Sequence, residues 1–137
     1  MREILYRAKS LCRGEGWVYG QPRHYALEKR REKWTIFDPY TGIETDIAEE
    51  TLGQYTGMNE KNGNKIFEGD IAMLLSRNVL TYGKTVNIKF IFDKGGFYAY
   101  LLDRECVLRN LPTKDIPKEA EIRIIGNIFD YNLEEIK

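Results

Sequence analysis

Residues 23–34 carry the side chains that bind phosphates and stack on bases. Lysine and arginine neutralise phosphate groups, and an aromatic ring offers a surface on which a base can stack whatever its sequence. The stretch therefore predicts a sequence-tolerant nucleic-acid surface. The residues that would form it are Arg23, Lys29, Arg30, Arg31, Lys33 and Trp34.

A second interpretation of the same stretch needs no nucleic acid. Glu28 and Glu32 interrupt the basic run, and the pI of the chain is about 6.6. Residues 1–33 have a charge balance of +5 and residues 34–70 a balance of −6. We favour a solvated basic face that pairs with the acidic segment 44–50, either within one chain or between two copies. The sequence does not choose between these partners and nucleic acid.

Glu68 and Asp70 flank Gly69 and could together hold a hard metal ion or act as a base. We favour the structural alternative, in which carboxylates at a glycine turn accept backbone N–H bonds. The single histidine, His24, leaves no acid–base constellation. Cys12 and Cys106 are too few for a zinc site and are expected to be free thiols. We therefore expect no metal, no cofactor and no enzyme activity.

Three glycine-marked turns organise the centre of the chain, at Thr56-Gly57, Asn62-Gly63 and Glu68-Gly69-Asp70. Asn-Gly between two apolar runs is a strong hairpin signal, and a type I′ turn needs positive φ at both central residues. We predict a type I′ hairpin between strands at 52–55 and 65–67. The third turn should reverse the chain into a buried strand at 71–75.

The rest of the chain reads mostly as short strands. Alternating apolar residues predict strands at 4–8, 17–20, 34–37, 85–92, 97–102 and 121–129. Residues 24–31 are ambiguous, since they contain helix formers but span only about two helical turns. We favour a strand there, with Tyr25 and Leu27 facing inward.

These elements predict a mainly β fold, with a β-rich α+β fold as the alternative. An N-terminal β-rich lobe at 1–65 would precede a C-terminal lobe at 66–137. Five short strands in the second lobe are compatible with an SH3-like barrel. No apolar run approaches the roughly 20 residues that span a bilayer. The N-terminus lacks the apolar core of a signal peptide, so a cytoplasmic location is expected.

Six motifs stand along the chain: GQYTG at 53–57, KNG at 61–63, IFEGDI at 66–71, REI at 2–4 leading to Arg7-Ala8, WVYG at 17–20 and IGNI at 125–128. Together they give the chain a resemblance to the YopX family of phage and prophage proteins. The resemblance covers nearly the whole chain and implies one compact β-rich protein of phage origin, without implying a particular activity. Residues 12–15 and the basic run 29–33 depart from the family pattern.

The expected function is that of a non-enzymatic phage or prophage accessory protein. It would act through protein–protein contacts with a phage or host protein, or by forming a homo-oligomer. The alternative is a nucleic-acid-binding module that uses residues 23–34. An enzyme would have to rest on carboxylates such as Asp70. No membrane partner is expected.

Overall fold

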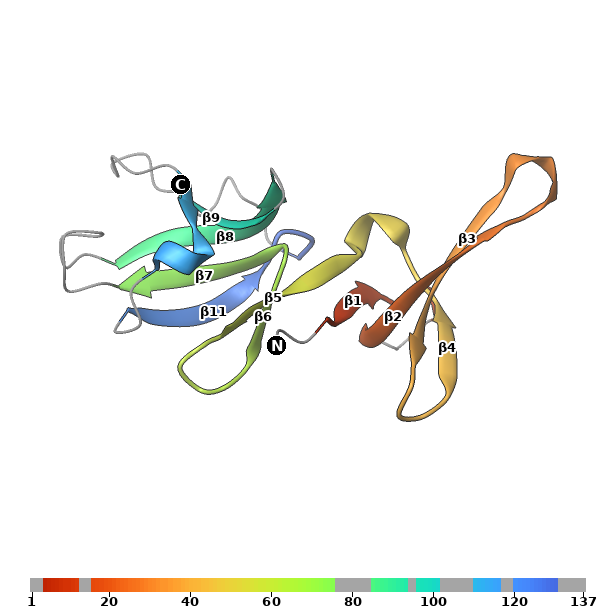
Figure 1. Ribbon diagram of the computed structural model, residues 1–137, viewed down its shortest axis with the longest axis horizontal. Coiled ribbons are helices and arrows are strands. Elements are labelled where there is room, and N and C mark those ends of the chain that lie inside the picture. The colour runs from red at the N-terminus through yellow and green to blue at the C-terminus, as the bar shows by residue number, and fades with distance from the viewer. Residues whose placement is uncertain are drawn as a thin grey trace. The chain divides into compact units, whose positions relative to one another are not determined.

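The computed structural model describes residues 4–12, 16–75, 85–93, 96–101, 110–116 and 120–130. The described strands form antiparallel sheets, and the helical content of these residues is limited to short 3-10 turns. The predicted mainly β class is confirmed (Figure 1). The chain divides into two compact units, Met1–Tyr55 and Thr56–Lys137. The boundary expected from the sequence, between residues 65 and 66, lies inside the second of these units.

The first unit is a sheet with the strand order β4-β3-β2-β1, and the start of β5 pairs with β1. One face of the sheet buries Ala8, Ile36 and Ile47, with Val18, Trp34 and Leu52 packed against them. Its elements are β1 (Tyr6–Lys9), β2 (Trp17–Ala26), η1 (Glu28–Arg30), β3 (Glu32–Asp38), β4 (Ile43–Asp46), η2 (Glu49–Thr51) and the beginning of β5 (Gly53–Asn59).

The segment 24–31 is a strand only up to Ala26 and then contains a 3-10 turn, so the favoured strand is found for residues 24–26 alone. The inward orientation expected for Tyr25 and Leu27 is wrong, because their side chains are 38% and 47% exposed. Beyond Gly20, β2 has β3 as its only paired neighbour among the described strands, and a two-stranded ribbon has no interior in which to bury them.

The second unit contains a five-stranded sheet in the order β10-β9-β8-β7-β11. Ile66, Leu74, Ile88, Phe90 and Ile122 belong to its core. Its elements are the remainder of β5, β6 (Lys65–Phe67), β7 (Asp70–Leu75), β8 (Thr85–Asp93), β9 (Gly96–Leu101), β10 (Asn110–Pro112), η3 (Thr113–Asp115) and β11 (Glu121–Asn127).

This sheet is open among the residues that the structure describes. Strands β10 and β11 lie at its two ends, and no pairing joins them there, whereas a closed barrel has no free edge. The sheet is therefore shown, and the SH3-like barrel stays a prediction.

The hairpin predicted at Asn62-Gly63 is present and joins β5 to β6, but its turn is not type I′. Gly63 has φ +90°, whereas Asn62 is not among the residues with positive φ. The Gly63 N–H donates to the Glu60 carbonyl over 2.9 Å, and the Glu60 N–H donates to the Asn64 carbonyl over 2.8 Å. This is the three-residue loop in which a type I turn is followed by one left-handed residue.

The loop of this hairpin lies along the edge of β11, in the second unit. The Ile124 N–H donates to Glu60 Oε2 over 2.9 Å, and the Lys61 N–H donates to the Ile122 carbonyl over 3.4 Å. Asn64 Nδ2 donates to the other oxygen of the Glu60 carboxylate, which is almost fully buried. Edge strands with unpaired backbone groups invite aggregation, and here the loop occupies part of that edge.

Candidate functional site

The most distinctive feature of the first unit is the long hairpin of β2 and β3 over residues 21–37, which we call the arm (Figure 1). Strand β1 pairs with β2 only at 17–20, and β4 pairs with β3 only at 35–38. The arm therefore consists of the outer halves of β2 and β3 joined by η1. Its base keeps β4 beside β3, and residues 24–34 have no third paired strand among the described residues. Isolated two-stranded ribbons are only marginally stable in water, so side-chain contacts must hold it.

The outer edge of β2 is poorly suited to pairing with a further strand. The Ile47 N–H donates to the Trp34 carbonyl, so the backbone groups of Trp34 point towards β4. The backbone N–H and C=O groups of successive residues in a strand point to opposite sides. In the register of β2 with β3, the backbone groups of Pro22, His24 and Ala26 therefore point away from β3. Proline has no N–H to donate, and such outward positions on edge strands are where it is tolerated.

Glu44 of β4 ties the two strands of the arm together. Its Oε2 accepts hydrogen bonds from the Tyr25 hydroxyl over 2.6 Å and from the Thr35 hydroxyl over 2.7 Å. Its Oε1 lies 3.1 Å from Arg23 Nη1. The Tyr25 and Thr35 hydroxyls, followed by Arg23, lower the pKa of the Glu44 carboxyl below its ordinary value. Glu44 therefore stays ionised, and one carboxylate contacts both strands of the arm.

Other contacts occupy two more of the predicted nucleic-acid-binding residues. Lys33 Nζ lies 3.3 Å from Asp46 Oδ1, so this lysine also pairs with the acidic segment. The Trp34 ring stacks on His24 with centroids 4.5 Å apart, and its indole N–H is buried without a hydrogen-bond partner among the described residues. Arg23, Lys33 and Trp34 thus take part in holding the arm.

The remaining predicted residues lie at the tip of the arm, residues 27–31. The Leu27 N–H donates to the Arg31 carbonyl over 2.8 Å and closes the ribbon. Lys29 adopts the left-handed conformation, with φ 61° and ψ 38°, which costs a non-glycine residue about 1 kcal/mol. The side chains of Lys29 and Arg31 are exposed and pair with no other described residue. The side chain of Arg30 lies outside the described part of the chain.

The predicted residues therefore fall into two sets. Arg23, Lys33 and Trp34 belong to the part nearest the sheet, and Lys29 and Arg31 lie at the tip. No described contact joins the two sets. The structure shows that part of the basic stretch meets the acidic segment 44–50 within one chain, and binding of nucleic acid by these residues stays a prediction.

Glu68 and Asp70 have the structural role that we favoured. Asp70 is buried, and its Oδ2 accepts the Phe67 N–H over 2.8 Å. Glu68 Oε2 accepts the Phe92 N–H over 3.3 Å. No cluster of histidine, cysteine and acidic residues with metal-binding geometry occurs in the described ranges. Cys12 is an exposed thiol, and Cys106 lies outside those ranges.

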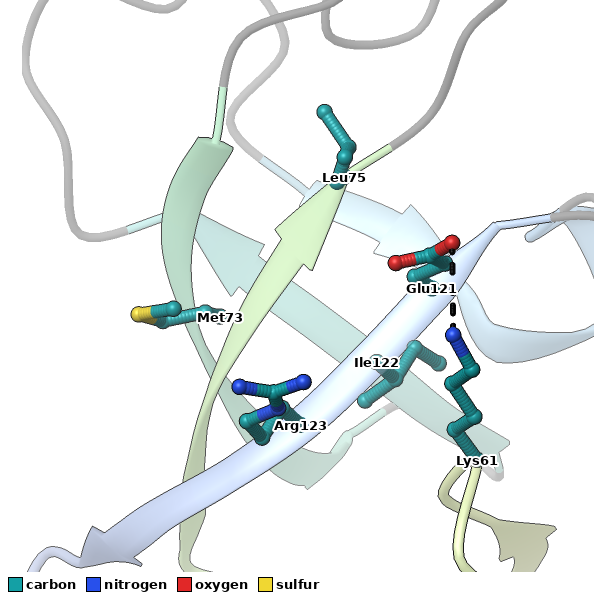
Figure 2. A pocket seen from close by; sticks show the side chains of 6 residues that line it. All are labelled: Lys61, Met73, Leu75, Glu121, Ile122 and Arg123. Carbon is teal, nitrogen blue, oxygen red and sulfur yellow. Dashed lines mark ion pairs between the residues drawn. The ribbon is translucent and has the colours of Figure 1, made fainter.

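A shallow hollow of about 170 Å³ opens on the second unit (Figure 2). Lys61 and Glu121 form an exposed ion pair at one side, with Nζ and Oε1 3.6 Å apart. Met73 and Arg123, neighbours on β7 and β11, lie together away from that pair. Small-molecule sites in proteins usually enclose at least about 300 Å³. The hollow therefore offers less support for function than the arm does. Its lining also includes Leu75 and Ile122.

Comparison with protein families decides the affiliation of the chain. The model of the YopX protein family matches residues 5–133, which is almost the entire sequence. The chain belongs to the YopX protein family. No curated protein and no solved structure matches it.

The resemblance expected for this YopX-family chain is thus confirmed, and the match includes the arm. Within the described ranges, no helix is long and apolar enough to cross a membrane.

Sequence reasoning missed Glu44, whose carboxylate accepts hydrogen bonds from Arg23, Tyr25 and Thr35. A signal for it was present. The turn at 38–42 fixes the register of β3 with β4 and places Phe37 opposite Glu44. Two residues further along each strand, Thr35 lies opposite Asp46. Side chains at these positions share one face of the sheet, as do Arg23 and Tyr25 across from β3.

Proposed function

We propose that this YopX-family chain is a non-enzymatic phage or prophage accessory protein that acts by contacting another protein through the tip of its arm. A cytoplasmic location is part of the proposal. The observation that carries it is the division of the arm, whose basic side chains near the sheet are paired while Leu27, Lys29 and Arg31 are exposed at its end.

The chemistry of the tip fits a protein surface. Leu27 is 47% exposed, and the exposed charged side chains of the same tip are Glu28, Lys29 and Arg31. Protein interfaces combine an apolar anchor with charged groups at the rim, which orient the partner. Lys29 is held in a conformation that glycine would adopt with less strain, which is consistent with selection for its side chain.

The second unit would serve as the scaffold of the protein, and we propose that it is an SH3-like barrel. Strands β7 to β10 follow one another as neighbours, and β11 returns beside β7 after the 3-10 turn η3. This order supports the barrel because one further pairing, between β10 and β11, would close the sheet.

Nucleic-acid binding is the second candidate. A two-stranded β-ribbon has the width that the major groove of DNA admits, and the arm is such a ribbon with a basic tip. Binding would depend on the few charges at the tip, because Arg23 and Lys33 are paired with carboxylates. Low-affinity, strongly salt-dependent retention of DNA or RNA would support it.

Site-specific photocrosslinking in cells tests the proposed contact. A photoreactive benzophenone amino acid replaces Leu27 in one variant and Tyr40 in a control, because Tyr40 is 97% exposed on a different turn of the same unit. We expect a discrete protein adduct at position 27 that is absent at position 40. Adducts with nucleic acid, or no adduct at position 27, would contradict the proposal.

A further inference from the structure

Two groups of like charge in the described part of the first unit have no ion-pair partner there. Arg23 and Lys33 are neutralised by Glu44 and Asp46. At the tip, three basic residues stand against the single exposed acid Glu28, and the exposed basic pair there is Lys29 and Arg31. At η2 the acidic pair Glu49 and Glu50 remains, exposed and without a side-chain partner among the described residues.

Each charged pair has an exposed leucine near it. Leu27 lies at the tip, and Leu11, which is 66% exposed, lies near η2. The Leu11 N–H donates to the Asp46 carbonyl over 2.9 Å, and the adjoining Ser10 pairs with Ile47 just before η2. The tip and this acidic patch, which we define as Leu11, Glu49 and Glu50, are therefore complementary in charge and both partly apolar.

The tip does not reach the acidic patch of its own chain. The described contacts contain no ion pair between Lys29 or Arg31 and Glu49 or Glu50. Strands β2 and β3 stay in register to Ala26 and Glu32, which carries the tip outward from the part of β3 that pairs with β4 (Figure 1). Two surfaces of opposite charge that do not meet within the described part of one chain can meet between two chains.

We propose that the partner of the tip is a second copy of this chain, and that the tip of each copy binds the acidic patch of the other. The inference rests on the proposed function and names its partner. Two chains related by a two-fold axis would form two equivalent contacts, each with Lys29 and Arg31 facing Glu49 and Glu50. The dimer would be weak and sensitive to salt, because its contacts are small and solvent-exposed.

Charge reversal with complementation tests this arrangement. One variant carries Lys29→Glu and Arg31→Glu, and the other carries Glu49→Lys and Glu50→Lys. Like charges then face each other in either variant alone, whereas an equimolar mixture restores opposite charges at both contacts. Lys114→Glu, an exposed lysine of the second unit, is the matched control.

Sedimentation equilibrium at low salt, from about 1 to about 100 μM protein, measures the association. We expect the wild type and the control to dimerise. Each reversed variant should associate at least about tenfold more weakly, and the mixture should recover the wild-type affinity. Circular dichroism checks that both variants are folded. Added salt should weaken the wild-type dimer.

A monomeric wild type over this range, equal association of all variants, or a mixture that fails to recover would each overturn the inference. Crosslinking distinguishes this failure from failure of the proposed function. If position 27 crosslinks to a different protein while the wild type is monomeric, the tip has another partner and only the inference falls. If position 27 yields no protein adduct, the proposed function falls as well.

Discussion

Gly20→Ala should be the most damaging single-atom change in the first unit. Gly20 lies in β2 at the base of the arm and has φ +152°, a value that residues other than glycine rarely adopt. A Cβ built there would lie 2.1 Å from the Phe37 carbonyl oxygen and 2.8 Å from its carbon. Ordinary contacts begin near 3.4 Å, so the backbones of β2 and β3 would have to separate by about an ångström or more.

The expected loss of unfolding free energy is about 3–4 kcal/mol. Backbone strain at an unfavourable φ contributes about 1–2 kcal/mol. Separation of the strands would disturb about two backbone hydrogen bonds next to the Gln21–Phe37 pair, at about 1 kcal/mol each. A small domain has a total stability of only about 5 kcal/mol or somewhat more, so the first unit would be close to unfolding.

Tryptophan fluorescence during urea unfolding isolates this unit, because Trp17 and Trp34 are the only tryptophans of the chain. Two glycines of the same unit are matched controls. Gly42 has φ +75° with no atom within 4 Å of an added Cβ, so Gly42→Ala should cost only strain, about 1 kcal/mol. Gly16 has neither constraint, and Gly16→Ala should change the stability little.

The order of the three variants is the decisive result. If Gly20→Ala were no more destabilising than Gly42→Ala, the close approach of Phe37 would have no energetic consequence. The inference that the base of the arm requires glycine at position 20 would then be refuted.

Four further predictions follow from particular contacts. Lys29→Gly should stabilise the first unit by about 0.5–1 kcal/mol in urea, because glycine relieves the strain at φ 61°; an unchanged or lower stability would contradict this. The fold lowers the pKa of Glu44, so the ionised carboxylate stabilises the first unit at pH values above the ordinary glutamate pKa, and this stabilisation is lost as the pH falls through the pKa in the folded state. Glu44→Gln should therefore make the stability of the first unit, followed by tryptophan fluorescence, less dependent on acid pH. Gly63→Val should destabilise the second unit by about 1–3 kcal/mol through strain alone, measured by amide exchange, and exchange identical to the wild type would refute the left-handed turn. A chain ending at residue 120 loses β11 and should not give a soluble, cooperatively melting product, whereas one ending at residue 131 should.

Local signals in the sequence were sufficient for most strands and for the position of the central hairpin. Asn62-Gly63 marks a reversal wherever two apolar runs flank it, but the type of turn depends on how the loop sits on β11. The bond from the Ile124 N–H to Glu60 joins residues 64 positions apart, and no local pattern encodes it. Composition alone also could not show that the central hairpin covers a sheet edge.

The sequence identified the residues of the candidate site, but it could not show that some of them are paired near the sheet while others are exposed at the tip. The run 23–34 has one composition, yet the side chains of Arg23 and Lys33 reach the carboxylates of Glu44 and Asp46 on β4, whereas Lys29 lies at the far end of the arm. That division depends on where β4 stops, at Asp46, and on the length of the arm. Tyr25 was expected to be buried because an aromatic residue in a strand usually has a sheet face to cover it, which the arm lacks.

The contacts of the arm suggest what kind of recognition it can perform. A two-stranded ribbon needs support, and here Glu44 and the His24–Trp34 stack supply it, which uses up the polar and aromatic groups near the sheet. Pro22 removes an N–H from the free edge of β2, so extending the sheet with a partner's strand is disfavoured. Recognition by the arm must then depend on the side chains at its tip. Because the tip is small, its affinity should come from reciprocal or repeated contacts, which is what a pair of identical chains provides.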